Sequence, residues 1–205
     1  FEDFLAFANA FLKNAGEPGF LLQADTNDDN IVDFTDFLAF TSAFLREAVP
    51  TAGTKVVATQ PLPGVNDNVE LALSLSDGKV LAGQTVTVNV ALSNATALNG
   101  FGFEVLFDAD KFEYVESAPA EEDLLKSGGA ETPLFLAHPG ETGQLVIANA
   151  VIDGAPVSGN GEVVSLTFKV LQEFEDNARF EIADGIVFDH DQLPNPVVSL
   201  GSLSV

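Results

Sequence analysis

Residues 85–108 read TVTVNVALSNATALNGFGFEVLFD, and the alternation of side chains in this stretch decides the fold class. Apolar residues occupy every second position from Val86 to Leu92 and again from Phe101 to Phe107. A period of two is typical of β-strands that place one face on a core. Asn99 and Gly100 form a dipeptide that favours a turn. The stretch therefore predicts two strands, over 85–93 and 100–108, with a turn between them.

Similar strand patterns continue to the end of the chain. The further predicted strands are 69–76, 111–117, 133–139, 144–151, 161–170, 178–189 and 196–205. Turn residues separate them at Asp77-Gly78, 140–143 and 158–161, while 121–129 predicts a short helix or an irregular loop. About nine strands without helical crossovers predict an all-β jelly-roll or β-sandwich domain over 68–205.

The first part of the chain has a different pattern. FEDFLAFANAF (1–11) is repeated as FTDFLAFTSAF (34–44), which predicts two copies of one helix. Residues 48–67 are rich in proline and threonine and predict a linker. The sequence therefore predicts two domains: a small α-helical module over 1–47 and the sandwich.

Between the two helix copies, residues 25–36 read DTNDDNIVDFTD, the twelve-residue pattern of an EF-hand loop. The predicted ligands are Asp25, Asn27, Asp29, the backbone carbonyl of Ile31, Asp33 (directly or through water) and Asp36. Calcium takes six to eight oxygen ligands, whereas magnesium demands stricter octahedral geometry. We therefore expect Ca2+ as the bound ion.

Two positions depart from the usual EF-hand pattern. Asn30 stands at the sixth position in place of glycine, and we expect it to adopt a positive φ. Asp36 stands at the twelfth in place of glutamate. Val32 suits a short β-contact between paired loops. In the first copy Asp3 corresponds to Asp36, so it predicts a partial second metal site.

Apolar side chains cover more of the predicted 34–46 helix than packing against one other helix requires. A module this small cannot bury phenylalanine on all sides. We therefore expect Phe7, Phe11, Phe40 and Phe44 to contact a partner protein. The alternative is that the paired helix or the sandwich covers them.

Charge and composition exclude several functions. The chain has 31 acidic and 8 basic residues, and its net charge of −23 would be repelled by nucleic acid and anionic membranes. Without cysteine it has no disulfide and no thiolate metal site. Its apolar runs are shorter than the roughly 18 residues of a membrane span, so we expect no membrane insertion.

The sequence also gives no catalytic constellation, and we expect no enzyme activity. His138 and His190 are the only histidines. The run Asp189-His190-Asp191 could bind a metal but is more typical of a solvated turn. Asn94-Ala95-Thr96 spells a glycosylation sequon.

Residues 1–11 and 25–44, with their loop and repeated helix start, resemble the dockerin module over 1–47. Residues 68–205 resemble the cohesin domain, on the segments KVLAGQTVTV (79–88), NGFGFEV (99–105), FDADKFEYV (107–115) and GEVVSLTFKV (161–170). The second resemblance implies a dockerin-binding face formed by strands around 100–108, 133–139, 144–151 and 178–184.

Together the resemblances imply a cellulosome-like scaffolding protein, secreted or at the cell surface, with cohesin or dockerin domains as partners. A plug and a socket on one chain would permit head-to-tail homo-assembly into filaments. Two alternatives stay open. One is a carbohydrate-binding module with a calcium-folded appendage, although the absence of tryptophan and the single tyrosine, Tyr114, weaken it. The other is a pair of accessory modules from a larger secreted glycoside hydrolase.

Overall fold

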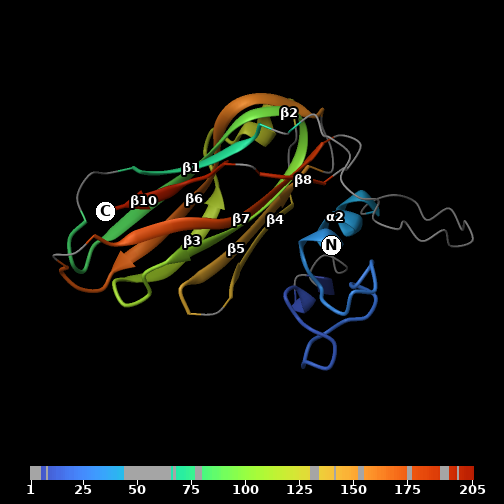
Figure 1. The fold of residues 1–205 in the computed structure, drawn as a ribbon, viewed down its shortest axis with the longest axis horizontal. Helices are drawn as coiled ribbons and strands as arrows, with labels where there is room; N and C mark the ends of the chain where they lie inside the picture. The colour runs from blue at the N-terminus through green and yellow to red at the C-terminus, as the bar shows by residue number, and fades with distance from the viewer. Residues whose placement is uncertain are drawn as a thin grey trace, which may run out of the picture. The chain divides into compact units, whose positions relative to one another are not determined.

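The computed structural model describes residues 6–7, 9–43, 66, 68–76, 80–129, 134–140, 142–151, 155–174, 177–189, 194–197 and 199–205. The chain divides into two compact units, Phe1–Leu62 and Pro63–Val205 (Figure 1). Apart from Asn66, the predicted linker lies outside the described residues. Within the described part, no helix is long and apolar enough to cross a membrane.

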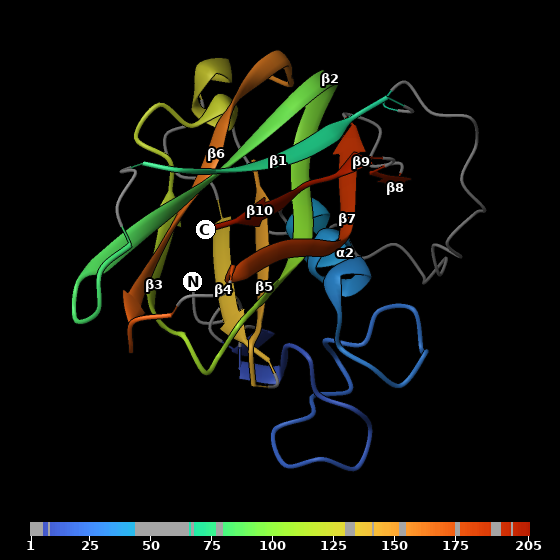
Figure 2. The ribbon, with the colours of Figure 1, turned by 60° about the vertical axis from the view of Figure 1, so that its left-hand side comes forward.

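The second unit is an all-β sandwich, as the sequence predicts (Figure 2). Its elements in chain order are β1 (Glu70–Leu75), β2 (Thr85–Phe107), β3 (Phe112–Pro119), the 3-10 helix η1 (Leu124–Gly128), β4 (Leu134–Pro139), β5 (Gln144–Ala150), β6 (Val157–Val170), β7 (Arg179–Asp189), β8 (Pro194–Pro196), β9 (Ser199–Leu200) and β10 (Ser202–Ser204). Most predicted strands agree with these bounds to within a few residues. The predicted final strand, 196–205, is instead broken into short pieces.

One long strand, β2, takes the place of the first two predicted strands. It has 23 residues, and its first half pairs with β1 and β6 while its second half pairs with β5 and β7. The turn predicted at Asn99-Gly100 is wrong, because Gly100 lies inside β2 opposite Ala150 and Phe188. A Cβ on Gly100 would lie 2.9 Å from the carbonyl oxygen of Asn149, so glycine here permits close packing of strands.

The irregular part of β2 lies before Gly100, between Leu92 and Leu98, where the register with β6 shifts twice. Asn94 and Ala97 have positive φ values of 63° and 49° in this stretch. The predicted turn at 158–161 is also wrong, since these residues belong to β6 and lie opposite the irregular stretch of β2. Turn-type residues here form bulges rather than chain reversals.

The sandwich core contains a cluster of aromatic rings around Phe168, which is fully buried. Its ring lies 4.9 Å from that of Phe180, 5.0 Å from that of Phe107 and 6.0 Å from that of Tyr114. These tilted and edge-on arrangements are the favourable ones for aromatic pairs. The cluster joins β2, β3, β6 and β7 in one core.

The first unit contains α2 (Phe34–Ala43), and residues 6–7 and 9–10 are also helical. Between them the backbone of Lys13 and Asn14 pairs with that of Ile31 and Val32. Four phenylalanines, Phe7, Phe11, Phe37 and Phe40, pack together with ring centroids 5.0 to 6.5 Å apart. These rings form the apolar centre of the unit.

Replacing Phe168 by alanine should lower the free energy of unfolding of the sandwich by about 3–5 kcal/mol, because the change removes a fully buried ring and leaves a cavity. Tyr114 is the only tyrosine and the chain has no tryptophan, so tyrosine fluorescence during denaturant unfolding reports on this unit. Val115→Ala is the control, since Val115 is 49% exposed on β3 and should change stability by less than about 0.5 kcal/mol. Equal effects of the two changes would contradict this assignment of the core.

Candidate functional site

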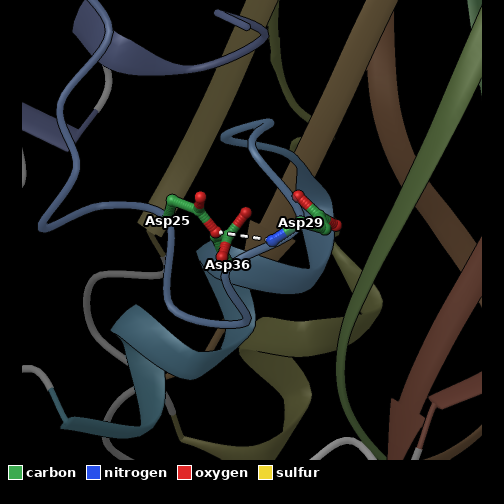
Figure 3. A group of neighbouring side chains, drawn as sticks. All are labelled: Asp25, Asp29 and Asp36. Carbon is green, nitrogen blue, oxygen red and sulfur yellow. Dashed lines mark hydrogen bonds between the residues drawn. The ribbon is translucent and has the colours of Figure 1, made fainter. Parts of the chain in front are cut away.

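The acidic loop brings together three of the predicted metal ligands. Asp25, Asp29 and Asp36 each offer a carboxylate oxygen, and these three oxygens lie within 4.8 Å of one another (Figure 3). Asp25 and Asp36 are buried, at 5% and 0% exposure, whereas Asp29 is exposed. Like charges this close repel one another, so the arrangement favours a bound cation.

Backbone amides of the loop hold Asp25 in place. Its Oδ1 accepts a hydrogen bond from the amide of Asp29 (3.2 Å) and its Oδ2 accepts one from the amide of Asn30 (3.0 Å). Asn30 has a φ of 72°, which confirms the predicted positive φ at this position. Asp28, in the backbone between Asp25 and these two amides, also has a positive φ, of 58°.

Asp36 lies in the first turn of α2 and joins that helix to the start of the loop. Its Oδ1 accepts hydrogen bonds from the amide of Thr26 (2.6 Å) and the hydroxyl of Thr26 (2.8 Å). Its Oδ2 accepts one from the amide of Asp33 (2.9 Å). A carboxylate at this end of a helix also interacts favourably with the helix dipole.

The other predicted ligands lie in the same loop but not in this group of three carboxylates. Asn27 Oδ1 accepts from the amide of Asp29 at 3.0 Å. Asp33 Oδ1 accepts from the amide of Thr35 at 2.8 Å. Burial raises the pKa of Asp33, and the nearby charges of Asp36 and Asp29 raise it further. The predicted ligand Asp3 lies outside the described residues.

The residues of the loop fit a hard cation. The donor set consists of carboxylate and carbonyl oxygens, which calcium prefers, and two of the carboxylates are buried. The ion would be held by Asp25, Asp29 and Asp36. The other predicted ligands, Asn27, Asp33 and the carbonyl of Ile31, lie close by in the chain. Val32 makes a β-contact with the segment after the first helix rather than with a paired loop. Its amide donates to the carbonyl of Lys13 (3.0 Å) and its carbonyl accepts from the amide of Leu12 (2.7 Å).

The structure does not support Phe7 and Phe11 as an exposed docking surface. They are 2% and 0% exposed, and both pack against Phe37. A unit this small needs these rings for its own core. Phe40 is half-buried and stacks on Phe7 at 5.0 Å, while Phe44 lies outside the described residues.

A second candidate site is one outer face of the sandwich. The four strands that the cohesin resemblance assigned to a binding face are neighbours in the order β4, β5, β2 and β7. One row of directly opposed residues crosses all four strands: His138, Val146, Glu104 and Asp184. Asp184 is exposed and the other three are half-buried.

Further along the same strands lie small and aliphatic residues, of which only Ile186 is partly exposed. Gly102 and Ala148 lie opposite one another next to Leu136 and Ile186. The alternation along each strand indicates which residues leave the core, but it gives no register between strands that are distant in sequence. Sequence reasoning therefore did not identify the row of His138, Val146, Glu104 and Asp184.

Of the acidic run around His190, only Asp189 is described, and it is buried on β7.

Solved structures share this fold. A cohesin module of a Clostridium perfringens family 33 glycoside hydrolase aligns at 12% identity with a TM-score of 0.57, covering 68% of this chain and 96% of that one. The sixth cohesin of Acetivibrio cellulolyticus scaffoldin B, solved with a dockerin, aligns at 20% identity with a TM-score of 0.51, covering 65% and 96%. A type I cohesin–dockerin complex from Clostridium thermocellum aligns at 13% identity with a TM-score of 0.53, covering 70% and 96%.

Identities this low show a common fold and do not define a function. No curated protein matches the chain. The family model for the cohesin domain, however, matches residues 69–199, which span the sandwich almost from its first strand to its last. On this match, the chain belongs to the cohesin domain family.

Proposed function

We propose that this chain is a calcium-dependent scaffolding protein that binds other proteins rather than catalysing a reaction. In this proposal the sandwich is a socket for dockerin modules, and the first unit is a dockerin-like plug. The observation that supports the socket most strongly is the cohesin family match over 69–199. The plug rests on the resemblance of residues 1–47 and on the carboxylate group in the loop.

Two further observations favour the socket. Solved relatives of the same fold include cohesins in complex with dockerins. In this chain β4, β5, β2 and β7 lie side by side, so the strands assigned to the binding face form one continuous surface. Two aliphatic residues of this face, Val146 and Ile186, are half-buried next to polar ones, and such a mixture suits a protein interface with a desolvated centre and a polar rim.

For the plug, Ca2+ would supply the interaction that holds the loop against the start of α2. Asp25 lies at the beginning of the loop and Asp36 in the first turn of the helix, so one ion would bridge them. Coupling of metal binding to folding is common in small modules. The Phe7 and Phe37 rings would then be held in place by the ion, and a helix surface would be available to a socket.

Plug and socket on the same chain would allow copies to bind one another head to tail. A heterologous contact of this kind builds open chains unless its geometry closes a ring. We place such an assembly outside the cell or at the cell surface, where calcium is plentiful.

A second candidate is that both units are accessory modules of a larger secreted glycoside hydrolase. It is favoured by the structural match to a cohesin module that belongs to such an enzyme. The coding sequence around this chain decides between the candidates, because only this second one requires an adjoining catalytic domain.

Removing one carboxylate of the group should weaken calcium binding. We expect Asp29→Asn to lower the affinity at least about tenfold, because an anionic ligand becomes neutral while its size is kept. Isothermal titration calorimetry on the full chain measures this. Asp28→Asn is the matched control: it removes the same charge from an exposed neighbour outside the group, and should change the affinity less than about threefold. Equal losses in the two variants, or no calcium binding by the unaltered chain, would refute the site.

Self-association should depend on both calcium and the face of β4, β5, β2 and β7. We expect the particle mass measured by light scattering to rise with protein concentration in calcium and to return to that of a monomer in chelator. Val146→Asp should weaken association at least about tenfold, because it introduces a charge into the interface. Val115→Asp, on the exposed strand β3, is the matched control and should leave association unchanged. A monomer at all concentrations in calcium would rule out homo-assembly.

A further inference from the structure

Two buried polar side chains meet where η1 packs on the sandwich. Asp123, the residue before η1, is 2% exposed, and Asn149 on β5 is fully buried. Asp123 Oδ1 accepts a hydrogen bond from the amide of Leu125 at 3.0 Å, so Asp123 caps the helix. Leu124 and Leu125 belong to the sandwich core. The carboxylate therefore lies in the interior, next to the helix that it caps.

The hydrogen bonding of this pair is incomplete. Asn149 Nδ2 donates to Asp123 Oδ2 over a long 3.4 Å, and Asn149 Oδ1 is buried without a hydrogen-bond partner. A buried acceptor without a donor is costly, and burial also disfavours the charged form of the Asp123 carboxylate. A single added proton would relieve both conditions, because it neutralises the carboxylate and supplies a donor.

Few charges act on Asp123 from the elements around it. Lys126 on η1 favours the ionised form. β5 contains no ionisable residue, and the ionisable residues of the other neighbouring strands are Glu104 on β2, Glu162 and Lys169 on β6 and His138 on β4. Burial is the largest influence and raises the pKa of Asp123. The folded sandwich therefore binds this proton more tightly than the unfolded chain does.

We propose that Asp123 and Asn149 form a latch between η1 and β5 that strengthens in acid. When the carboxyl group takes up a proton from solvent, its O–H donates to Asn149 Oδ1 and the amide of Asn149 donates back to the other carboxyl oxygen. The change requires rotation of these two side chains and no other bond changes. The amide of Leu125 keeps its acceptor, so η1 stays capped.

The direction of the pH effect follows from proton binding. Between the ordinary pKa of aspartate and the raised one, the folded chain holds more protons at this site than the unfolded chain. The contribution of the latch to stability is therefore complete at acidic pH. It is lost as the pH rises through the raised pKa of Asp123.

NMR titration of the unaltered full chain tests the latch directly. The side-chain carboxyl carbon of Asp123 and the side-chain amide of Asn149 should shift together, with one midpoint above the range of an ordinary aspartate. The protection of the Leu125 amide from exchange, relative to its intrinsic exchange rate at the same pH, should rise in acid. A midpoint within the ordinary range, or an Asn149 amide that does not follow Asp123, would overturn the proposal.

A variant separates this carboxylate from the many others. Asp123→Asn keeps an oxygen for the cap and offers an amide donor at every pH. Between about pH 4 and pH 7 we expect the unfolding midpoint of the sandwich, read from Tyr114 fluorescence, to vary less with pH in this variant than in the unaltered chain. Glu121→Gln, an exposed change in the same segment, should keep the original pH dependence. The same pH dependence in Asp123→Asn as in the unaltered chain would count against the latch.

Discussion

The hydrogen bonding of β2 is the constraint on which the rest of the sandwich depends. A strand of 23 residues cannot stay in one sheet of a small sandwich, and β2 passes from one sheet to the other through the irregular stretch between Leu92 and Leu98. The bulges leave three backbone amides without strand partners, and side chains from other segments accept from them. Asn160 Oδ1 accepts from the amide of Asn94. Asn66 Oδ1 accepts from the amide of Thr96, and Ser158 Oγ accepts from the amide of Ala97. The crossing is thereby stabilised despite its positive φ values.

This crossing also positions the face that we propose for partner binding. Beyond it, the second half of β2 lies between β5 and β7, so Glu104 and Gly102 are placed near the middle of a four-stranded surface. The other half of the strand contributes to the opposite sheet with β1 and β6. One continuous element, β2, therefore belongs both to the proposed socket and to the buried aromatic cluster around Phe168.

Much of this architecture could be predicted from the sequence, because the period-two alternation is strong wherever one face of a strand is buried. The failures occurred at turn-type residues. Asn99-Gly100 and residues 158–161 favour turns locally, but here they permit close strand packing and bulges, which only the tertiary structure reveals.

In the acidic loop over 25–36, the spacing correctly predicted that Asp25, Asp29 and Asp36 converge, because ligand positions there are set by local chain geometry. The predicted docking role of Phe7 and Phe11 neglected the unit's need for its own core. The row through Val146 and Glu104 depends on strand register, which sequence alone does not fix.

We propose that the face of β4, β5, β2 and β7 is the partner-binding surface of this chain. It can be tested by recording backbone amide chemical shifts of the full chain in calcium, at low and at high protein concentration. We expect the changes within the sandwich to concentrate on residues 134–139, 144–150, 100–106 and 184–188, and chelator to reverse them. Changes confined to β3 and β6, or spread evenly over both sheets, would contradict it.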